Sequence, residues 1–290
     1  MRASRGERIF YSVNYILLFL ISITCLYPLI NILAISLSSN DAIISGKVQI
    51  WPVGFSLTSY DAIMKGSSVL DAFRNSLIIT IVGAAICMLF TLLAAYPLSR
   101  KEFYGRKAFT LAIVFTMLFN GGLIPNYLLV KSLGLIDSYF AIWLPTAISV
   151  YNMLIMKSYF ENLPQELEDA ARIDGASEWT FIIRIVLPLS APMLATIALF
   201  YTVGLWNSFL NVLIYINDPL KYNLSVLVQQ MVSSQSIIQD FSNNLEEISK
   251  LTPEGVKAAG VIILILPVMI VYPFVQKYFV KGAMIGAIKG

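Results

Sequence analysis

Residues 162–188 read NLPQELEDAARIDGASEWTFIIRIVLP, a polar interval between two long apolar segments. The pattern predicts two short helices that meet at Gly175, because glycine readily adopts the left-handed conformation that ends many helices. Asn162 is placed to cap the first helix and Ser177 to cap the second. A helix of about two turns is only marginally stable alone in water, so we expect this interval to dock on another surface.

Two charged features of this interval have local explanations. Glu168 precedes Arg172 by four positions, the favourable order for an ion pair on a helix. We expect that pair to be exposed and worth roughly 0.3–0.5 kcal/mol. Asp174 lies just before the second helix, so its side chain is interpreted first as a cap and second as a partner contact.

The composition excludes a soluble domain. The chain is 58% hydrophobic and 13% charged, with a mean hydropathy of +0.75, which leaves too little polar surface to cover its outside. There is no histidine, so a histidine-based triad and a zinc site are excluded. We find no GxxxxGK[ST] phosphate loop and therefore expect no ATP site of that kind in this chain.

Six apolar segments are long enough to cross about 30 Å of hydrocarbon. We therefore predict an all-α, polytopic membrane protein with one domain, residues 1–290. The spans lie near residues 10–37, 77–98, 108–130, 139–156, 192–215 and 258–280. The third is interrupted by Gly121, Gly122 and Pro125, which predicts a helix followed by a re-entrant or loop-like piece. No span carries a carboxylate paired with a base, which argues against an ion-coupled transporter.

The basic residues predict the orientation in the membrane. Residues 99–107 read SRKEFYGRK, a short loop with four basic residues, which the positive-inside rule places in the cytoplasm. Both termini and the interval 162–188 then also face the cytoplasm. The basic N-terminus is followed by no small-residue cleavage site, so we expect its apolar run to be retained as the first span.

The interval also carries a family resemblance. Asp169-Ala170-Ala171, then Gly175, then Ile185-Val186-Leu187-Pro188 resembles the EAA signature of the membrane subunits of ABC importers. The fuller ELEDAARIDGAS is similar to the version in carbohydrate importers of the maltose-permease type. Asp169 stands where that family usually has glutamate. The stretches FNGGLIPNYLLVKSLGLIDS and VKGAMIGAIKG look most like permeases for complex or polysaccharide-derived oligosaccharides.

The resemblance implies a type I ABC importer permease fold with a cytoplasmic coupling helix, in a multi-pass protein of the bacterial cytoplasmic (inner) membrane. It implies a second related permease subunit, two ATP-binding subunits that use ATP and Mg²⁺, an extracytoplasmic sugar-binding protein and an oligosaccharide substrate. No cofactor is expected on this chain, and no nucleic acid. The residues expected to couple to the ATPase are Leu163, Leu167, Asp169, Ala170, Ala171, Asp174, Gly175, Trp179 and Pro188. The tail, residues 279–290, is expected to reach the same interface.

A second group of residues is a candidate for the substrate pathway. The fifth span carries a stripe with Asn207, Asn211, Trp206 and Tyr215, and the two asparagines are one helical turn apart. They are interpreted either as hydrogen-bonding contacts between helices or as a polar wall that binds sugar hydroxyls. Small residues on the second span, from Thr80 through Gly83 and Cys87 to Thr91 and Ala95, predict a face that packs against protein.

Other interpretations stay open at this level. The acidic outer loop, residues 216–255, is either a solvated loop or, by resemblance, the surface that receives the binding protein. The whole chain could also serve an ABC importer for a non-sugar solute, or be an uncoupled channel or membrane scaffold. Copurification with a nucleotide-binding subunit separates the channel from the importer, and uptake tests separate the solutes.

Overall fold

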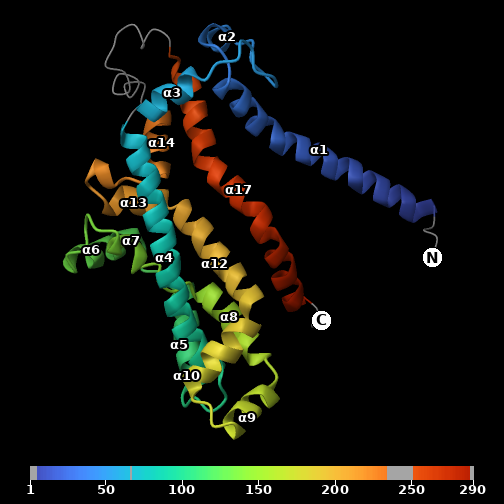
Figure 1. The fold of residues 1–290 in the computed structure, drawn as a ribbon, viewed down its shortest axis with the longest axis vertical. Helices are drawn as coiled ribbons and strands as arrows, with labels where there is room; N and C mark the ends of the chain where they lie inside the picture. Colours follow the sequence, from blue (N-terminus) through green and yellow to red (C-terminus); the bar gives the residue numbers. More distant parts are fainter. Residues whose placement is uncertain (1–4, 66, 234–250, 288–290) are drawn as a thin grey trace. The chain divides into compact units, whose positions relative to one another are not determined.

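The computed structural model describes residues 5–65, 67–233 and 251–287 of the chain, and in these ranges all regular structure is helical (Figure 1). The all-α prediction is therefore confirmed. Residues 234–250 of the predicted outer loop, Arg2 near the N-terminus, and Lys289 and Gly290 of the predicted tail lie outside the described residues.

Three helices are long and apolar enough to cross a membrane, at Gly6–Ser36, Ser68–Ser99 and Pro253–Pro273. Two bent pairs pass the same test together. Arg106–Leu118 and Leu123–Ser132 meet at 114°, and Glu178–Leu189 and Ala191–Trp206 meet at 80°. The interruption predicted in the third span is thus present, and Gly122 has a φ of +87° at the break. Length and composition give three to five spans in the described residues, so the count of six stays a prediction.

Three predicted spans differ from the helices that form. The second begins at Ser67 rather than near residue 77, because the more polar residues before the apolar span are also helical and form the start of α4 (Ser67–Ser99). The segment 139–156 is split into α7 (Phe140–Trp143) and α8 (Val150–Glu161). Its break contains Pro145, which has no backbone N–H to donate to a helix. The segment 192–215 is likewise split into α12 (Ala191–Trp206) and α13 (Phe209–Tyr215).

The described helices gather into two compact units, whereas the sequence predicts one domain. Unit 1 comprises Met1–Leu70 and Leu227–Leu266, and unit 2 comprises Asp71–Val226 and Pro267–Gly290. Among the described residues, the sequence boundaries between the units fall within α4, α14 (Leu224–Ser233) and α17 (Pro253–Ala287).

Unit 1 holds α1 (Arg5–Ser36), α2 (Asn40–Ile44) and α3 (Thr58–Lys65). Its polar contacts join segments that are far apart in sequence. Tyr60 Oη donates to Ser36 Oγ at 2.8 Å, and Thr252 Oγ1 donates to Asn40 Oδ1 at 3.3 Å. The apolar surface of α1 is open along its span, as expected for a helix in lipid or against another membrane subunit.

Unit 2 holds the main hydrophobic core. The described elements of this unit include α4, α5 (Arg106–Leu118), α6 (Leu123–Ser132), α7, α8, α9 (Gln165–Ile173), α10 (Glu178–Phe181), the π-helix η1 (Ile182–Val186), α11 (Leu187–Leu189), α12, α13 and the short η2 (Pro219–Lys221). The predicted small-residue face of α4 is confirmed, since Thr80, Cys87, Thr91 and Ala95 are all buried. At Gly83 an added Cβ would lie 2.7 Å from the Trp143 ring, so that glycine permits close approach of α7.

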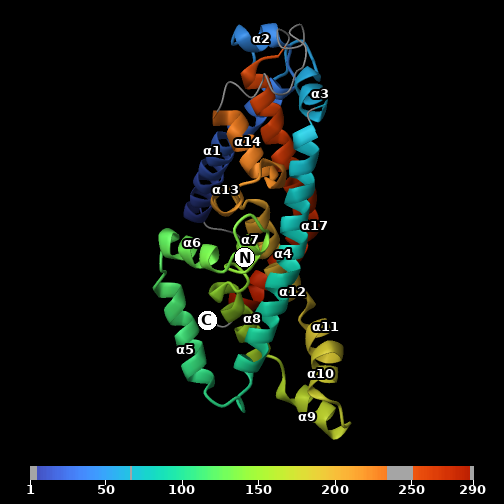
Figure 2. The same ribbon diagram turned by 90° about the vertical axis from the view of Figure 1, so that its left-hand side faces the viewer.

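Helix α4 connects the two polar ends of unit 2. Near its start, Asn75 Nδ2 donates to the carbonyls of Leu220 and Tyr222 at 2.8 and 3.0 Å. Just after its end, Arg100 contacts α9. An α-helix covers about 36 Å between Asn75 and Ser99, enough for the hydrocarbon of a bilayer. Figure 2 shows α9 and the turn between α4 and α5 at the same end of this unit. The segments that the sequence assigns to opposite sides of the membrane are therefore at opposite ends of α4.

Candidate functional site

The interval 162–188 forms the two predicted helices, joined at Gly175. Helix α9 ends at Ile173, and Gly175 follows with a φ of +74°. The amide of Ala176 closes the turn by donating to the carbonyl of Ala171 at 2.9 Å. Ser177 caps α10, since its hydroxyl accepts from the amide of Thr180. The left-handed glycine and the serine cap are local features, which explains why the sequence shows them.

Two of the predicted caps are wrong. Asn162 is the residue after α8, because α8 extends to Glu161, and its Nδ2 donates back to the carbonyl of Ser158 at 2.6 Å. Pro164 then occupies the position before α9. Asp174 ends α9 and is exposed, so it does not cap α10; Ser177 has that role.

Glu168 is the polar centre of this region. Its side chain is 6% exposed, and it accepts from Arg100 Nη1 at 2.8 Å and from Arg172 Nη2 at 2.6 Å. The Arg100 guanidinium also lies over the Tyr96 ring, 4.4 Å from its centroid. The predicted pair with Arg172 is confirmed, but it is not an exposed pair. Removing one partner of a buried ion pair costs about 3–5 kcal/mol, so Glu168 is expected to anchor α9.

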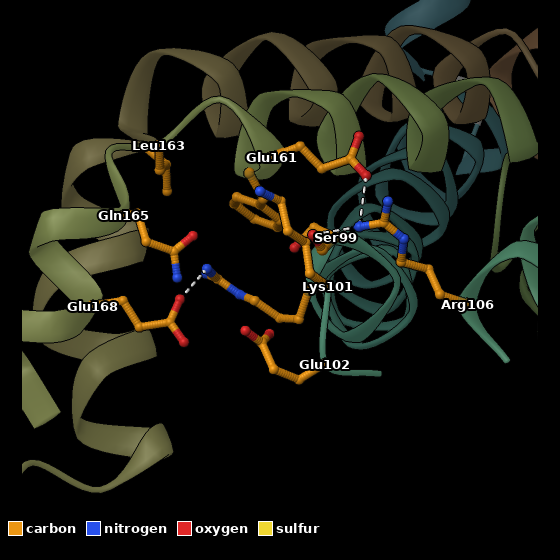
Figure 3. A pocket seen from close by; sticks show the side chains of 10 residues that line it. Ser99, Lys101, Glu102, Arg106, Glu161, Leu163, Gln165 and Glu168 are labelled. Atoms are coloured by element: carbon orange, nitrogen blue, oxygen red, sulfur yellow. Dashed lines mark hydrogen bonds and ion pairs between the residues drawn. The ribbon is translucent and has the colours of Figure 1, made fainter. Parts of the chain in front are cut away.

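A pocket of about 390 Å³ lies between α9, the end of α8 and the loop after α4. Figure 3 shows Gln165 and Glu168 of α9 on one side of it and Arg106 joined to Glu161 on another. Arg106 Nη1 lies 3.4 Å from Glu161 Oε1 and donates to the carbonyl of Ser99 at 3.3 Å. The basic loop 99–107 is therefore bound by one ion pair to α9 and by another to the end of α8, an arrangement that the sequence does not predict.

The predicted docking residues of α9 divide into two faces. Leu163 and Leu167 are half-buried and Ala171 is buried, and all three pack against the core of unit 2. They are not open to a partner, because an amphipathic helix this short uses its apolar face to attach to its own chain. Asp169 and Ala170 are exposed on the opposite face.

Two exposed residues of α9, Glu166 and Ile173, were not among the predicted docking residues. Ile173 is 86% exposed, and Trp179 on α10 is 65% exposed. The signal was present in the sequence, since Glu166, Asp169, Ala170 and Ile173 follow the i, i+3, i+4, i+7 spacing of one helical face. We define the open face as Glu166, Asp169, Ala170, Ile173 and Trp179. Gly175 lies in the exposed turn, and Pro188 is exposed on α11.

The second predicted group, on the fifth span, is not brought together. A separate cavity of about 410 Å³ in unit 2 is lined by Asn211 but not by the other three members. Asn207 ends α12, and its Nδ2 donates to the carbonyl of Val203 at 3.0 Å. Trp206 is buried edge-on against Phe73.

Tyr215 is also buried, and it stacks on Tyr127. The two asparagines were expected on one face of a continuous helix. They are separated instead, because the chain leaves the helix at Asn207 and Ser208 before α13 begins.

A further ion pair lies at the opposite end of unit 2. Asp137 has a φ of +63°, accepts from the amides of Asn217 and Asp218, and lies 2.9 Å from Lys221 Nζ. The hydrogen bond from Lys221 lowers the pKa of Asp137, and the amide donors add to the effect. The same hydrogen bond raises the pKa of Lys221. The pair thus holds the start of the loop 216–255 to the turn before α7.

Comparisons with known proteins agree with this architecture. The family model described as "Binding-protein-dependent transport system inner membrane component" matches residues 94–284. The chain is 40% identical over 284 residues to the polygalacturonan/rhamnogalacturonan transport system permease protein YtcP of Bacillus subtilis (strain 168), covering 98% of this chain and 99% of that protein. It is 40% identical over 293 residues to protein LplC of the same organism, covering 100% and 98%.

A solved structure has the same fold. It is the crystal structure of a bacterial ABC transporter involved in the import of the acidic polysaccharide alginate. The match has a TM-score of 0.88 and 33% sequence identity, and it covers 96% of this chain and 99% of that chain.

Proposed function

Because the chain belongs to the family of binding-protein-dependent transport system inner membrane components, we propose that it is the permease subunit of an ATP-driven oligosaccharide importer and forms half of its translocation pathway. The second half is a related permease, and two ATP-binding subunits and an extracytoplasmic binding protein complete the assembly. ATP and Mg²⁺ are bound by the ATP-binding subunits, and this chain has no ATPase activity of its own.

The observation that carries the proposal is the attachment of α9. Its inner face packs into the core of unit 2, its Glu168 binds Arg100 at the end of α4, and its open face remains free for a partner. A force applied to the open face by an ATP-binding subunit therefore reaches α4 through an ion pair and packed side chains. This is the connection that alternating access requires between ATP-driven closure and the membrane helices.

The orientation follows from the same attachment. The open face and the basic loop 99–107 lie at one end of unit 2, and the positive-inside rule assigns that end to the cytoplasm of a bacterial inner membrane. Both termini are proposed to be cytoplasmic as well. The loop 216–255 then faces outward, where the binding protein delivers its sugar.

The substrate class is proposed from the relatives. Names of the similar proteins include polygalacturonan/rhamnogalacturonan and alginate, all of them polysaccharides. We therefore assign oligosaccharides released from polysaccharides as the cargo.

The test is transport by the reconstituted assembly. The chain is expected to copurify with a nucleotide-binding subunit. Proteoliposomes that contain the complete transporter, supplied with the binding protein, are expected to accumulate labelled oligosaccharide only when ATP is present on the side of the membrane that carries the ATP-binding subunits. Permeation that is independent of ATP would instead indicate a channel. ATP-dependent uptake of an amino acid, peptide or ion in place of sugar would assign the permease to another solute.

A further inference from the structure

The segment from the end of α2 to the start of α3, residues 44–57, carries large apolar side chains that the chain leaves open. Ile44 is 76% exposed, Trp51 79% and Phe55 70%, and Ile50 is exposed as well. Such side chains are ordinary when they are scattered singly over a surface. Their concentration in one short segment instead marks an interaction surface.

The other side of this segment is attached to the end of α1. Val48 is buried in a small cluster with Ala34 of α1 and Ala42 of α2. The amide of Val53 donates to Ser38 Oγ at 3.0 Å. The segment therefore has one side packed on its own chain, and its position relative to α1 is fixed.

Two contacts give the depth of the segment along α1. Asn31 Nδ2 donates to the carbonyl of Gln49 at 2.7 Å, and the amide of Ser56 donates to the carbonyl of Leu37 at 3.0 Å. Asn31 and Leu37 are separated by about 9 Å of helical rise. The segment thus follows the last turns of α1, at the end that Figure 1 shows next to α2 and away from the N-terminus.

This part of α1 is where the hydrocarbon layer ends. Arg8 and Asp41 bound an uncharged run of the chain. About 20 residues cross the hydrocarbon, so a span counted from Arg8 ends at roughly residue 29, and a span centred on the run ends at roughly residue 34. Asn31 lies between these limits. Trp51 is therefore placed at the boundary between hydrocarbon and headgroups, and Phe55 in the headgroup layer.

The exposed side chains fit this depth. Tryptophan combines an apolar ring with one N–H donor and is enriched where hydrocarbon meets headgroups. Lys47 is exposed in the same segment, and its apolar stem and terminal amine suit a position beside a headgroup phosphate. A soluble protein would meet the segment only above the hydrocarbon, so phospholipid is the occupant that matches the depth of Trp51.

We propose that residues 44–57 form an interfacial anchor, which binds phospholipid at the membrane surface where α1 ends and inserts Trp51 at the hydrocarbon boundary. The inference goes beyond the proposed function, because it requires only that α1 crosses the bilayer. The anchor holds the end of α1 at a fixed depth, although the span itself is open along its length.

The test measures the fluorescence of Trp51 in the complete transporter, in vesicles of phosphatidylcholine and phosphatidylglycerol. Part of the phosphatidylcholine carries bromine on its acyl chains, which quenches tryptophan that contacts lipid. Subtracting the emission of the Trp51→Phe complex from that of the wild type isolates Trp51 and cancels every other tryptophan. Trp51 is exposed, so this substitution is expected to leave the fold unchanged.

Bromine near the headgroup end of the acyl chains is expected to lower the Trp51 emission about twofold or more, and bromine near the methyl end is expected to lower it less. Trp206 is the matched control, because it is only 5% exposed. The emission that Trp206→Phe removes is expected to respond less to either brominated lipid than the emission of Trp51.

Three results would overturn the anchor. Quenching of Trp51 by acrylamide in the water phase, without quenching by brominated lipid, would place the segment in water. Protection of Trp51 from both quenchers would assign the surface to a neighbouring subunit. Loss of the quenching by lipid when the loaded binding protein is added would assign it to that protein.

Discussion

Glu168 of α9 binds Arg100, 68 positions earlier in the chain, with 2.8 Å between Oε2 and Nη1. The carboxylate is almost fully buried, and the arginine is the first residue after α4. This contact joins α9, which carries the open face, to α4, which connects the two polar ends of unit 2. Loss of the contact should weaken the attachment of α9 to α4 while both helices still form.

We expect Glu168→Gln and Arg100→Ala each to reduce coupled transport at least tenfold and to destabilise the protein by about 3 kcal/mol, because each leaves one partner of a buried ion pair unpaired. Arg172→Ala is the matched control. Arg172 is 55% exposed and its removal keeps the Arg100 contact, so the cost should be below about 1 kcal/mol. Thermal unfolding in detergent and sugar-dependent ATP hydrolysis by the complex measure the two effects. Equal losses in all three variants would contradict the role of Arg100.

The two faces of α9 should respond differently to the same substitution. Ile173→Glu is expected to abolish copurification with the ATP-binding subunits while the unfolding temperature of the permease is unchanged, since Ile173 is exposed. Asp169→Lys should weaken the same contact by reversing a charge. Leu167→Glu is expected instead to lower the unfolding temperature, because Leu167 packs against the core. Retention of the ATP-binding subunits by Ile173→Glu would place the partner elsewhere.

Gly83 should tolerate no side chain. Gly83→Ala places a Cβ 2.7 Å from Trp143 and 2.9 Å from Leu205, so we expect a loss of about 1–3 kcal/mol from overpacking. The Trp143 indole cannot move freely, because its Nε1 donates to the carbonyl of Ile79. Gly204→Ala serves as the control for stability alone, since its Cβ would meet no atom within 4 Å. Equal unfolding temperatures for the two variants would contradict the close approach of α7 to α4.

The Asp137–Lys221 pair predicts a defined pH range of stabilisation. The pKa of Asp137 is lowered, so its contribution is present above the unfolded value of about 4 and is lost as the pH falls through the folded value. The pKa of Lys221 is raised, so its contribution is present below about 10.5 and is lost as the pH rises through its folded value. The pair should stabilise the fold evenly between about pH 5 and pH 10.

Asp137→Asn removes the charge but keeps a residue that tolerates the positive φ. Urea unfolding of the wild type and this variant should therefore differ by a constant amount across neutral pH and converge below about pH 4. A difference that stays constant down to pH 2 would show that the ionised carboxylate is not the stabilising group.

Local features of the chain were predictable, and long-range ones were not. The turn at Gly175 and the cap at Ser177 depend on neighbouring residues, and the small-residue face of α4 depends on helical spacing alone. The burial of Glu168 depends on its contact with Arg100, and no sequence pattern within residues 162–188 predicts a contact with a residue 68 positions away. The exposure of Ile173 follows from helical spacing if the apolar face of α9 packs against the chain's own core, because Ile173 then lies on the opposite face.

The fifth span shows why the helical spacing of the sequence did not predict the separation of Asn207 and Asn211. Asn207 and Asn211 are four positions apart and share a face of any continuous helix. The helix instead breaks at Ser208, whose hydroxyl donates to the carbonyl of Leu205 at 2.6 Å, and Asn223 Nδ2 donates to the carbonyl of Ser208 itself. Asn223 lies fifteen positions from Ser208, so only the folded chain shows which asparagine reaches the cavity.

The unbroken length of α4 gives the molecule a lever. With Arg100 held by α9 at one end and Asn75 bonded to the chain at Leu220 and Tyr222 at the other, a tilt of about 10° around the Ser99 end displaces Asn75 by about 6 Å over its 36 Å length. Cys87, at the midpoint, moves by about half as much. Because the displacement grows with distance from the Ser99 end, it is about twice as large at Asn75 as at Cys87.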